Sequence, residues 1–454
     1  MAQHPQAPWA RAAGQGSNLK HSFFYSLLGN LVAPVAGLAI APILAQGLGD
    51  EGRGALGGIS SLLLVATALG AFGLPEALTY YAARRASKVS SLLRLVSWIL
   101  LLSAALLALA LYLLGPYLAA DHGSWYQQLL LLTALALIPN LLILVPRALV
   151  AAQGFWQLQA LEQGVFSLVR LLAFLLLWAS GQLTVLSAVL VTLLSPLLGA
   201  LVYLPVLLRI HRQKDLYASQ EQSASELLGY GGKVWLGSLS GIVLSRIDQT
   251  LMIKLTSLQE QGLYAVAVTL GEIPSVISHA VRNVIFALDA RDTTSEEGAQ
   301  QADRRLAQTA RVTTILTFLV SLPIALTAHW WLGPVFGRDF EAALPLVWVL
   351  LAAAVVGSAG SVAGAGLSGR GRPGLRSWSM TVGAVFNLAV LLLLTPQIGA
   401  MGAALSTLVG NFLAGNLNLV FLRTHFKIPL RSFYGIHRED LQLLKKILTS
   451  LIKR

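Results

Sequence analysis

Four ionisable side chains interrupt long apolar runs of the sequence, where charge is rare. They are Arg170, Arg246, Asp248 and Glu272. A charged group at the centre of a bilayer costs about 2.5–3.5 kcal/mol on insertion scales, so it persists where it faces water or a partner. Arginine grips phosphate through two parallel hydrogen bonds. These residues therefore predict a cationic substrate cavity for an anionic group, such as a pyrophosphate or an acidic sugar.

Helical spacing separates these candidates into faces. Arg246 and Asp248 are two positions apart, so they point to different sides of a helix and do not pair with each other. Glu272, His279 and Asn283 follow at intervals of seven and four, which places them on one polar stripe. The secondary cavity candidates are Lys254, His279, Arg282 and Asn283.

A purely structural role also stays open for these side chains, as an alternative to lining a cavity. Glu272 can pair with Arg246 or Arg170 across a cleft, and a buried pair of this kind can serve only to fix helix register. His279 and Asn283 equally suit hydrogen bonds between helices.

The rest of the chain must place these groups in lipid. Of its 454 residues, 56% are hydrophobic and 11% are charged, against about 25% charged in soluble domains. The mean hydropathy is +0.69. The net charge of +12 is spread over short gaps between apolar runs, which is typical of membrane topology and excludes nucleic acid as the partner. We predict an all-α polytopic membrane protein with about twelve transmembrane helices.

The candidate spans form two sets of six. The first set is 22–46, 55–80, 92–114, 126–149, 159–179 and 184–208. The second set is 234–255, 262–287, 308–329, 342–367, 375–394 and 399–422. Most of the 32 lysines and arginines then fall on one side, with Arg53 and Arg338 on the other. This bias predicts that both termini are cytoplasmic and that the protein lies in the cell membrane.

The two halves share local patterns in the same order. The turn 50–56 resembles 259–264, and the segment 150–154 resembles 366–370. Because each half has six spans, the repeats are predicted to be parallel, with a substrate cleft between them. The predicted division is a disordered tail at 1–18, an N-lobe at 19–210, a cytoplasmic linker at 211–228, a C-lobe at 229–424 and a basic amphipathic tail at 425–454. That tail suits an anionic membrane surface, with a solvated terminal helix as the alternative.

Motifs for chemistry are absent. The sequence has no Walker motif, no HExxH and no Gly-x-Ser-x-Gly elbow, and it has no cysteine. We therefore expect no catalytic residue, no metal and no cofactor. Coupling to an ion gradient stays open.

Several segments together resemble the oligosaccharide flippases of polysaccharide biosynthesis, the Wzx type. They are 41–44, 48–52, 72–74, 80–84, 245–248 and 262–267, followed by Glu272. That family stands within the wider exporter superfamily that also holds the MATE multidrug antiporters. The resemblance places Arg246 and Asp248 in the span-seven motif, whereas Arg170 matches no motif.

The resemblance implies a helical exporter with two lobes around a cationic cavity. Its cargo would be an oligosaccharide on an undecaprenyl pyrophosphate carrier, flipped from the inner to the outer leaflet by alternating access. Membrane lipids and other polysaccharide assembly proteins would be its partners. A MATE-like cation-coupled drug exporter is the alternative, although the mid-span charge is basic. A membrane polymerase or ligase would need a large external loop, which the predicted topology lacks.

Overall fold

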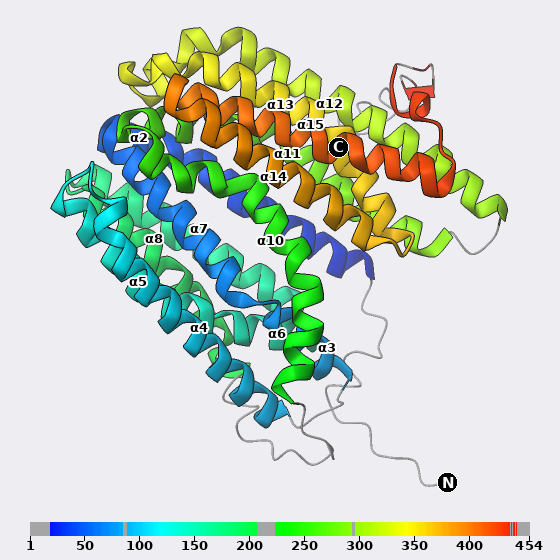
Figure 1. Ribbon diagram of the computed structural model, residues 1–454, viewed down its shortest axis with the longest axis horizontal. Coiled ribbons are helices and arrows are strands. Elements are labelled where there is room, and N and C mark those ends of the chain that lie inside the picture. The colour runs from blue at the N-terminus through cyan, green and yellow to red at the C-terminus, as the bar shows by residue number, and fades with distance from the viewer. Residues whose placement is uncertain are drawn as a thin grey trace. The chain divides into compact units, whose positions relative to one another are not determined.

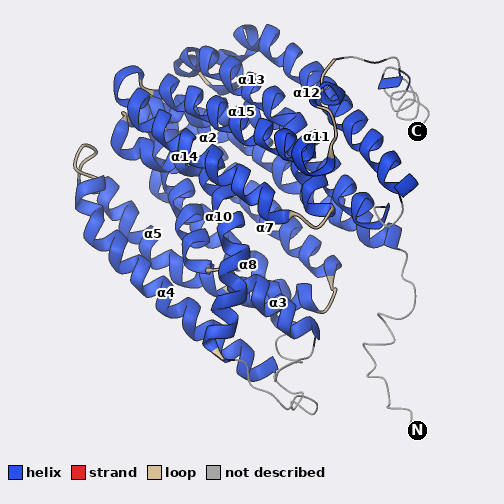
Figure 2. Ribbon diagram, turned by 45° about the vertical axis from the view of Figure 1, so that its right-hand side comes forward, coloured by secondary structure: helices blue, strands red, loops and turns tan. Residues whose placement is uncertain are grey.

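The described part of the chain, in a computed structural model, consists of helices joined by short turns and loops (Figures 1 and 2). The described residues are 19–84, 89–206, 223–292 and 296–435, with 437, 439, 440 and 442. The helices of the first half are α2 (Leu19–Ala71), α3 (Leu74–Arg84), α4 (Val89–Leu118), α5 (Ser124–Leu142), α6 (Leu144–Ala152), α7 (Trp156–Ala179), α8 (Val185–Ala200) and η1 (Leu201–Tyr203). Those of the second half are α10 (Ala224–Leu255), α11 (Leu258–Asp292), α12 (Glu296–Phe336), η2 (Arg338–Ala343), α13 (Leu344–Gly369), α14 (Pro373–Ile398), α15 (Ala400–Phe426) and η3 (Leu430–Phe433). The predicted all-α class is confirmed.

Nine helices within the described residues are long and apolar enough to cross a membrane, and the bent helix α10 makes ten. The protein is therefore a multi-pass membrane protein. The count of about twelve stays a prediction. One reason for the lower number is that α2 counts once, although it contains a break at Gly49 (φ 68°, ψ −175°) between two predicted spans.

The predicted span 55–80 is not one helix. Helix α2 ends at Ala71 and α3 begins at Leu74, with Phe72 (φ 47°) and Gly73 (φ 67°) both in the left-handed region. A side chain on Gly73 would collide with the backbone of Gly231, since a Cβ there would lie 2.1 Å from the Gly231 carbonyl oxygen. The break therefore lets the start of α10 pack directly on this turn.

The chain forms two compact units. Unit 1 comprises the described residues up to Ile40, Leu69–Pro116 and Gln128–Trp235. Unit 2 comprises Ala41–Ala68, Tyr117–Gln127 and the described residues from Leu236 onward. The predicted lobes 19–210 and 229–424 differ from this division, because part of α2 and the turn before α5 pack with the second half. Helix α10 begins at Ala224, inside the predicted linker 211–228. Residues 1–18, 211–222 and 443–454 lie outside the described part.

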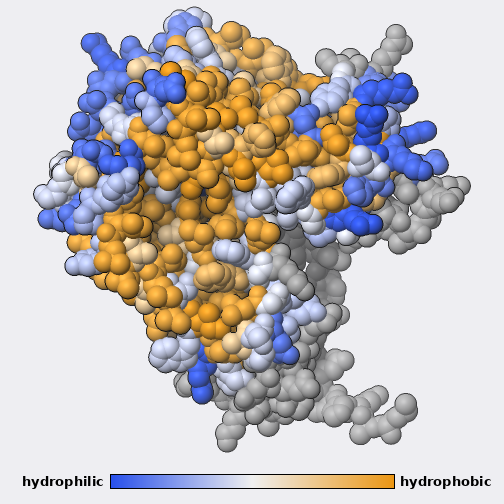
Figure 3. Space-filling view, in the orientation of Figure 1, coloured by the Kyte–Doolittle hydropathy of each residue, from blue (hydrophilic) through white to orange (hydrophobic). Residues whose placement is uncertain are grey.

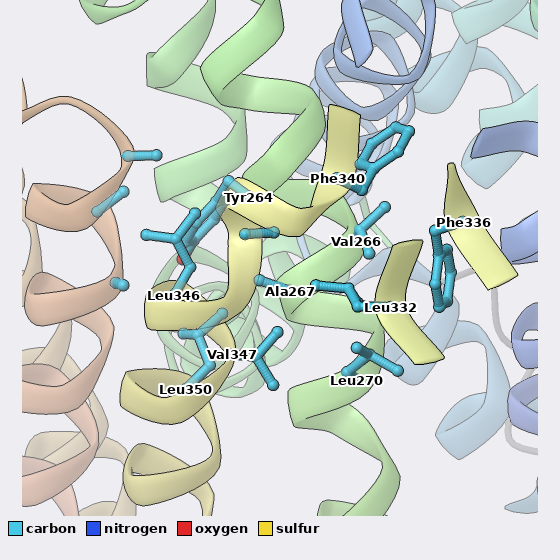
Figure 4. Packing of buried hydrophobic residues seen from close by; sticks show 14 of the residues in the cluster. Tyr264, Val266, Ala267, Leu270, Leu332, Phe336, Phe340, Leu346, Val347 and Leu350 are labelled. Carbon is cyan, nitrogen blue, oxygen red and sulfur yellow. The ribbon is translucent and has the colours of Figure 1, made fainter. Parts of the chain in front are cut away.

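Unit 2 has its core between α11, α12 and α13. Figure 4 shows Ala267 and Leu270 of α11 beside Leu332 of α12, with Val347 and Leu350 of α13 nearby. All five are buried. Close packing of these side chains gives the van der Waals contacts that hold helices together in lipid.

Helix α15 packs closely on α13 through glycine. A Cβ on Gly360 would lie 2.0 Å from the Cα of Gly415, so the two backbones touch. Close contact of small residues is the usual way for helices to associate in lipid, where no hydrophobic effect drives them together.

The two segments that the sequence paired as repeats, 50–56 and 259–264, are both helical and meet inside unit 2. A Cβ on Gly54 would lie 1.9 Å from the carbonyl oxygen of Leu258, and one on Gly262 would lie 2.0 Å from that of Asp50. The glycine of each segment therefore packs directly against the backbone at the start of the other helical stretch. The duplication itself stays a prediction.

Unit 1 exposes apolar stripes. On α8, Leu186, Leu190, Leu194 and Leu198 are exposed at intervals of one helical turn. Figure 3 shows hydrophobic residues over the middle of the helices facing the viewer, with hydrophilic residues gathered near helix ends. Such stripes would be unstable in water and are suited to lipid contact.

The start of the predicted amphipathic tail is anchored to α12. The guanidinium of Arg311 binds both carboxylate oxygens of Asp440 at 2.8 Å, and both side chains are buried. Arg311 also donates to the carbonyl of Ser432. Both predicted roles, a solvated helix or one lying on a membrane surface, therefore apply at most to the residues beyond this anchor.

Candidate functional site

The antiparallel helices α10 and α11 bring Arg246 and Glu272 together. Arg246 Nη2 forms an ion pair with Glu272 Oε1 at 2.7 Å, with 27% and 54% of the two side chains exposed. This is one of the two pairs that the sequence suggested. It lies within unit 2 and not across a cleft between lobes. The exposed carboxylate leaves the pair open to exchange with another anion.

Asp248 occupies a different environment. Only 2% of it is exposed. Its Oδ2 accepts hydrogen bonds from Tyr264 and from Thr407 (2.9 Å), and its Oδ1 accepts from the backbone N–H of Gln249 (2.7 Å). Within the described residues Arg246 and Asp248 form no ion pair with each other, and both reach partners on α11. The carboxylate of Asp248 is enclosed by protein donors, so in this structure it joins α10, α11 and α15 and does not line an open space.

Lys254, a secondary candidate, has a partner that the sequence did not reveal. Its Nζ lies 2.5 Å from Asp121 Oδ2 and 4.9 Å from the ring centroid of Tyr117. The hydrogen bond and positive charge of Lys254 hold the pKa of Asp121 below its ordinary value. The charge of Lys254 is therefore already balanced by Asp121.

A cavity of about 130 Å³ in unit 2 contains two arginines. Arg282 of α11 and Arg376 of α14 line it, with Ser361, Asn411 and Asn418 on α13 and α15. None of the described lining residues is acidic, and within the described part of the chain neither arginine forms an ion pair. Among the described residues these two like charges therefore line one cavity with no acidic partner, so this cavity is suited to an anion.

Local sequence places Arg376 at this cavity. Helix α14 starts with Pro373 in its first turn and ends before Gly399, whose φ is 60°. The stem of Arg376 crosses Gly364 of α13, where a Cβ would lie 3.3 Å from Arg376 Cγ. The absence of a side chain at Gly364 therefore lets the guanidinium reach the cavity.

The other predicted cavity residues do not join this group. His279 is exposed one turn before Arg282 on α11, and the side chain of Asn283 lies outside the described part. Arg170 lies on α7 in unit 1, with its guanidinium carbon 5.7 Å from the ring centroid of Phe174. Its buried Nε has no hydrogen-bond partner among the described residues. Membership of all four main candidates in one substrate cavity stays a prediction.

Comparison with known proteins gives the family. Residues 19–286 match the protein family described as "Polysaccharide biosynthesis protein". The probable low-salt glycan biosynthesis flippase Agl15 of Haloferax volcanii is 23% identical over 186 residues, which are 41% of this chain and 39% of that protein. This chain matches about two fifths of the length of the curated relatives.

Solved structures share the fold over nearly the whole chain. The lipid II flippase MurJ, in an inward closed conformation, superposes with a TM-score of 0.70 and 13% identity, covering 94% of this chain and 92% of that one. The MATE multidrug transporter DinF-BH gives a TM-score of 0.60 and 15% identity, covering 96% and 100%. Since the family model matches more than half of its residues and agrees with the resemblance found in its sequence, the chain belongs to the polysaccharide biosynthesis protein family of membrane proteins.

Proposed function

We propose that this protein flips an oligosaccharide linked to undecaprenyl pyrophosphate from the inner to the outer leaflet of the cell membrane. The family, the flippase among its relatives and the fold of the lipid II flippase support a lipid-linked cargo. The observation that carries the proposal is the cavity with Arg282 and Arg376, which offers two guanidinium groups to an anion.

The cargo carries its negative charge at the pyrophosphate. A guanidinium binds a phosphate through two parallel hydrogen bonds, and this pairing is strong where water is excluded. Arg246 provides a further cation, and an entering phosphate can compete with Glu272 for it. Alternating access would then expose these groups first to one leaflet and then to the other.

This function needs no catalytic group, metal or cofactor, and an ion gradient can supply the energy. We place both termini in the cytoplasm, on the basis of the lysine and arginine bias in the loops. Membrane lipids and the other proteins of polysaccharide assembly are the proposed partners.

A MATE-like cation-coupled multidrug exporter is the second candidate, because the fold is shared with a multidrug transporter. A cationic drug needs acidic side chains in its cavity. The described lining of the arginine cavity has none, which favours an anionic cargo.

Deletion of the gene tests the two candidates. A flippase deletion accumulates the lipid-linked oligosaccharide in the inner leaflet, and the wild-type gene restores the polysaccharide. A deletion strain that makes normal polysaccharide and becomes sensitive to cationic drugs would instead support the exporter.

A further inference from the structure

A second cavity lies in unit 1, and none of the charged candidates discussed so far lines it. It measures about 600 Å³ and is lined by α3, α6, the start of α7 and the start of α10. Pockets for small ligands usually measure about 300–1,000 Å³ and combine apolar walls with a few polar groups. This one is large enough for a sugar ring, and both kinds of group are present.

One wall of this pocket is aromatic. The rings of Tyr80 and Tyr230 are stacked, with centroids 4.4 Å apart and planes at 21°. Tyr81 meets Tyr230 edge-on at 6.0 Å and holds it from the side. The face of an aromatic ring is negative, so it attracts the weakly positive C–H groups on one side of a pyranose.

The fold fixes the position of Tyr230. Its neighbour Gly231 packs against the turn at Gly73, where no side chain could fit between the two backbones. Tyr230 itself lies against the buried cluster of α3, α4 and α6. The aromatic wall is therefore preformed and does not need to be ordered by a ligand.

The rest of the lining includes polar groups with charges of both signs. Arg147 Nη2 donates to Glu162 Oε1 at 2.7 Å, and Glu162 is 3% exposed. Gln159 Nε2 donates to the carbonyl of Arg147 at 3.3 Å, and Glu76 presents an exposed carboxylate. The side chains lining the pocket thus offer both donors and acceptors. Hydroxyl groups, which need both, suit this part of the lining better than a phosphate, because Glu162 already neutralises Arg147.

We infer that this pocket binds a pyranose ring of the glycan that the protein carries, separately from the arginine cavity that would hold the pyrophosphate. The inference rests on the proposed function for the origin of the sugar. The predicted topology puts the ends of α3 and α6 at the cytoplasmic face, where a lipid-linked glycan would first meet the protein.

Binding of free sugars to the purified full-length chain in lipid nanodiscs tests this pocket without requiring transport. The probes are the methyl glycosides of glucose, galactose, mannose and N-acetylglucosamine, followed by saturation-transfer NMR. Tyr230→Leu removes the ring and Tyr230→Phe keeps it. Tyr112→Leu, at an exposed tyrosine of α4 outside the pocket lining, is the matched control.

We expect wild type, Tyr230→Phe and Tyr112→Leu to bind at least one glycoside with similar affinity. Tyr230→Leu should bind it about tenfold more weakly, the loss expected for one aromatic contact. If Tyr230→Leu does not fold, Gln159→Leu replaces it with the same expectation. The inference is overturned if wild type binds no glycoside, if the pocket variants bind as well as wild type, or if inorganic phosphate displaces the sugar.

These outcomes separate the pocket from the proposed function. A chain that restores polysaccharide in the deletion strain but binds no glycoside keeps the proposed function and loses this pocket. A chain that binds a glycoside but leaves the lipid-linked oligosaccharide distribution unchanged keeps the pocket and loses the proposed function.

Discussion

Arg282 of α11 and Arg376 of α14 line one cavity of unit 2, and within the described residues no acid is paired with either. Holding two like charges together in a mostly apolar unit is costly, and a bound anion would offset that cost. A structural role alone would be served better by a pair of opposite charge. The arrangement therefore indicates a binding site.

Removing either arginine should weaken binding of the anionic headgroup. For Arg282→Ala or Arg376→Ala we expect affinity for undecaprenyl pyrophosphate to fall about tenfold or more, because a hydrogen bond to a charged group contributes about 1.5–3 kcal/mol. Binding can be measured by calorimetry in nanodiscs. Arg372→Ala is the control, since Arg372 is exposed in the turn before α14 and does not line the cavity. Equal affinity for all three variants would contradict the assignment.

The Arg246–Glu272 pair should matter more for transport than for stability. Its two members are partly exposed, and such pairs contribute about 0–1 kcal/mol. We expect Arg246→Ala to leave the melting temperature nearly unchanged while transport in the deletion strain falls at least severalfold. A large drop in melting temperature with normal transport would assign this pair to the scaffold instead.

The carboxylate of Asp248 should behave in the opposite way. Tyr264→Phe removes one of its buried donors, and leaving a buried group unsatisfied costs about 1–3 kcal/mol. We therefore expect a clear loss of thermal stability in detergent. Tyr434→Phe, at an exposed tyrosine, provides the comparison. If both variants have the same melting temperature as wild type, the hydrogen bond from Tyr264 does not stabilise Asp248 as described.

Gly73 should tolerate no side chain. It adopts φ 67°, and a Cβ would meet the Gly231 carbonyl at 2.1 Å, so Gly73→Ala must displace either the turn or α10. Backbone strain of this kind costs about 1–3 kcal/mol before any steric clash. Gly374→Ala should be nearly neutral, because a Cβ there meets nothing within 4 Å. Thermal unfolding of both variants, compared with wild type, checks the difference.

The tail anchor should depend on pH. Burial raises the pKa of Asp440, but the hydrogen bonds from Arg311 and the backbone N–H of His437 outweigh this, so the pKa lies below its ordinary value. A lowered pKa stabilises the folded state above the unfolded value of about 3.9, and this contribution is lost as the pH falls through the folded value. Proteolysis of the tail should therefore accelerate only in acid. Asp440→Asn should accelerate it at neutral pH as well, and a pH-independent rate in wild type would contradict this account.

The sequence predicted the site residues that are charged and lie well inside an apolar span. Arg246 and Glu272 were found because ionisable groups are rare inside spans. Arg376 was missed because it lies at the start of α14, where arginines at the membrane surface are common. Tyr264 and Thr407 carry no charge, so nothing in the pattern marked them as partners of Asp248.

The fold was predictable as far as hydropathy determines it. Apolar runs located most helices to within a few residues, as for α13 and α14. The break at Gly49 falls in the gap between two predicted spans, whereas the break at Gly73 was missed because residues 62–74 are mostly apolar up to and through that turn. The packing of 41–68 with unit 2 depends on backbone contact at Gly54 and Gly262, which composition cannot reveal.

Transbilayer movement of a lipid-linked oligosaccharide in proteoliposomes tests the central claim most directly. A fluorescent oligosaccharide on undecaprenyl pyrophosphate is placed in one leaflet, and its exposure on the other is followed by quenching. We expect the purified wild-type chain to move it faster than protein-free liposomes do, and the double variant Arg282→Ala, Arg376→Ala to lose most of that rate. Movement no faster than in protein-free liposomes, or a double variant as fast as wild type, would contradict the account.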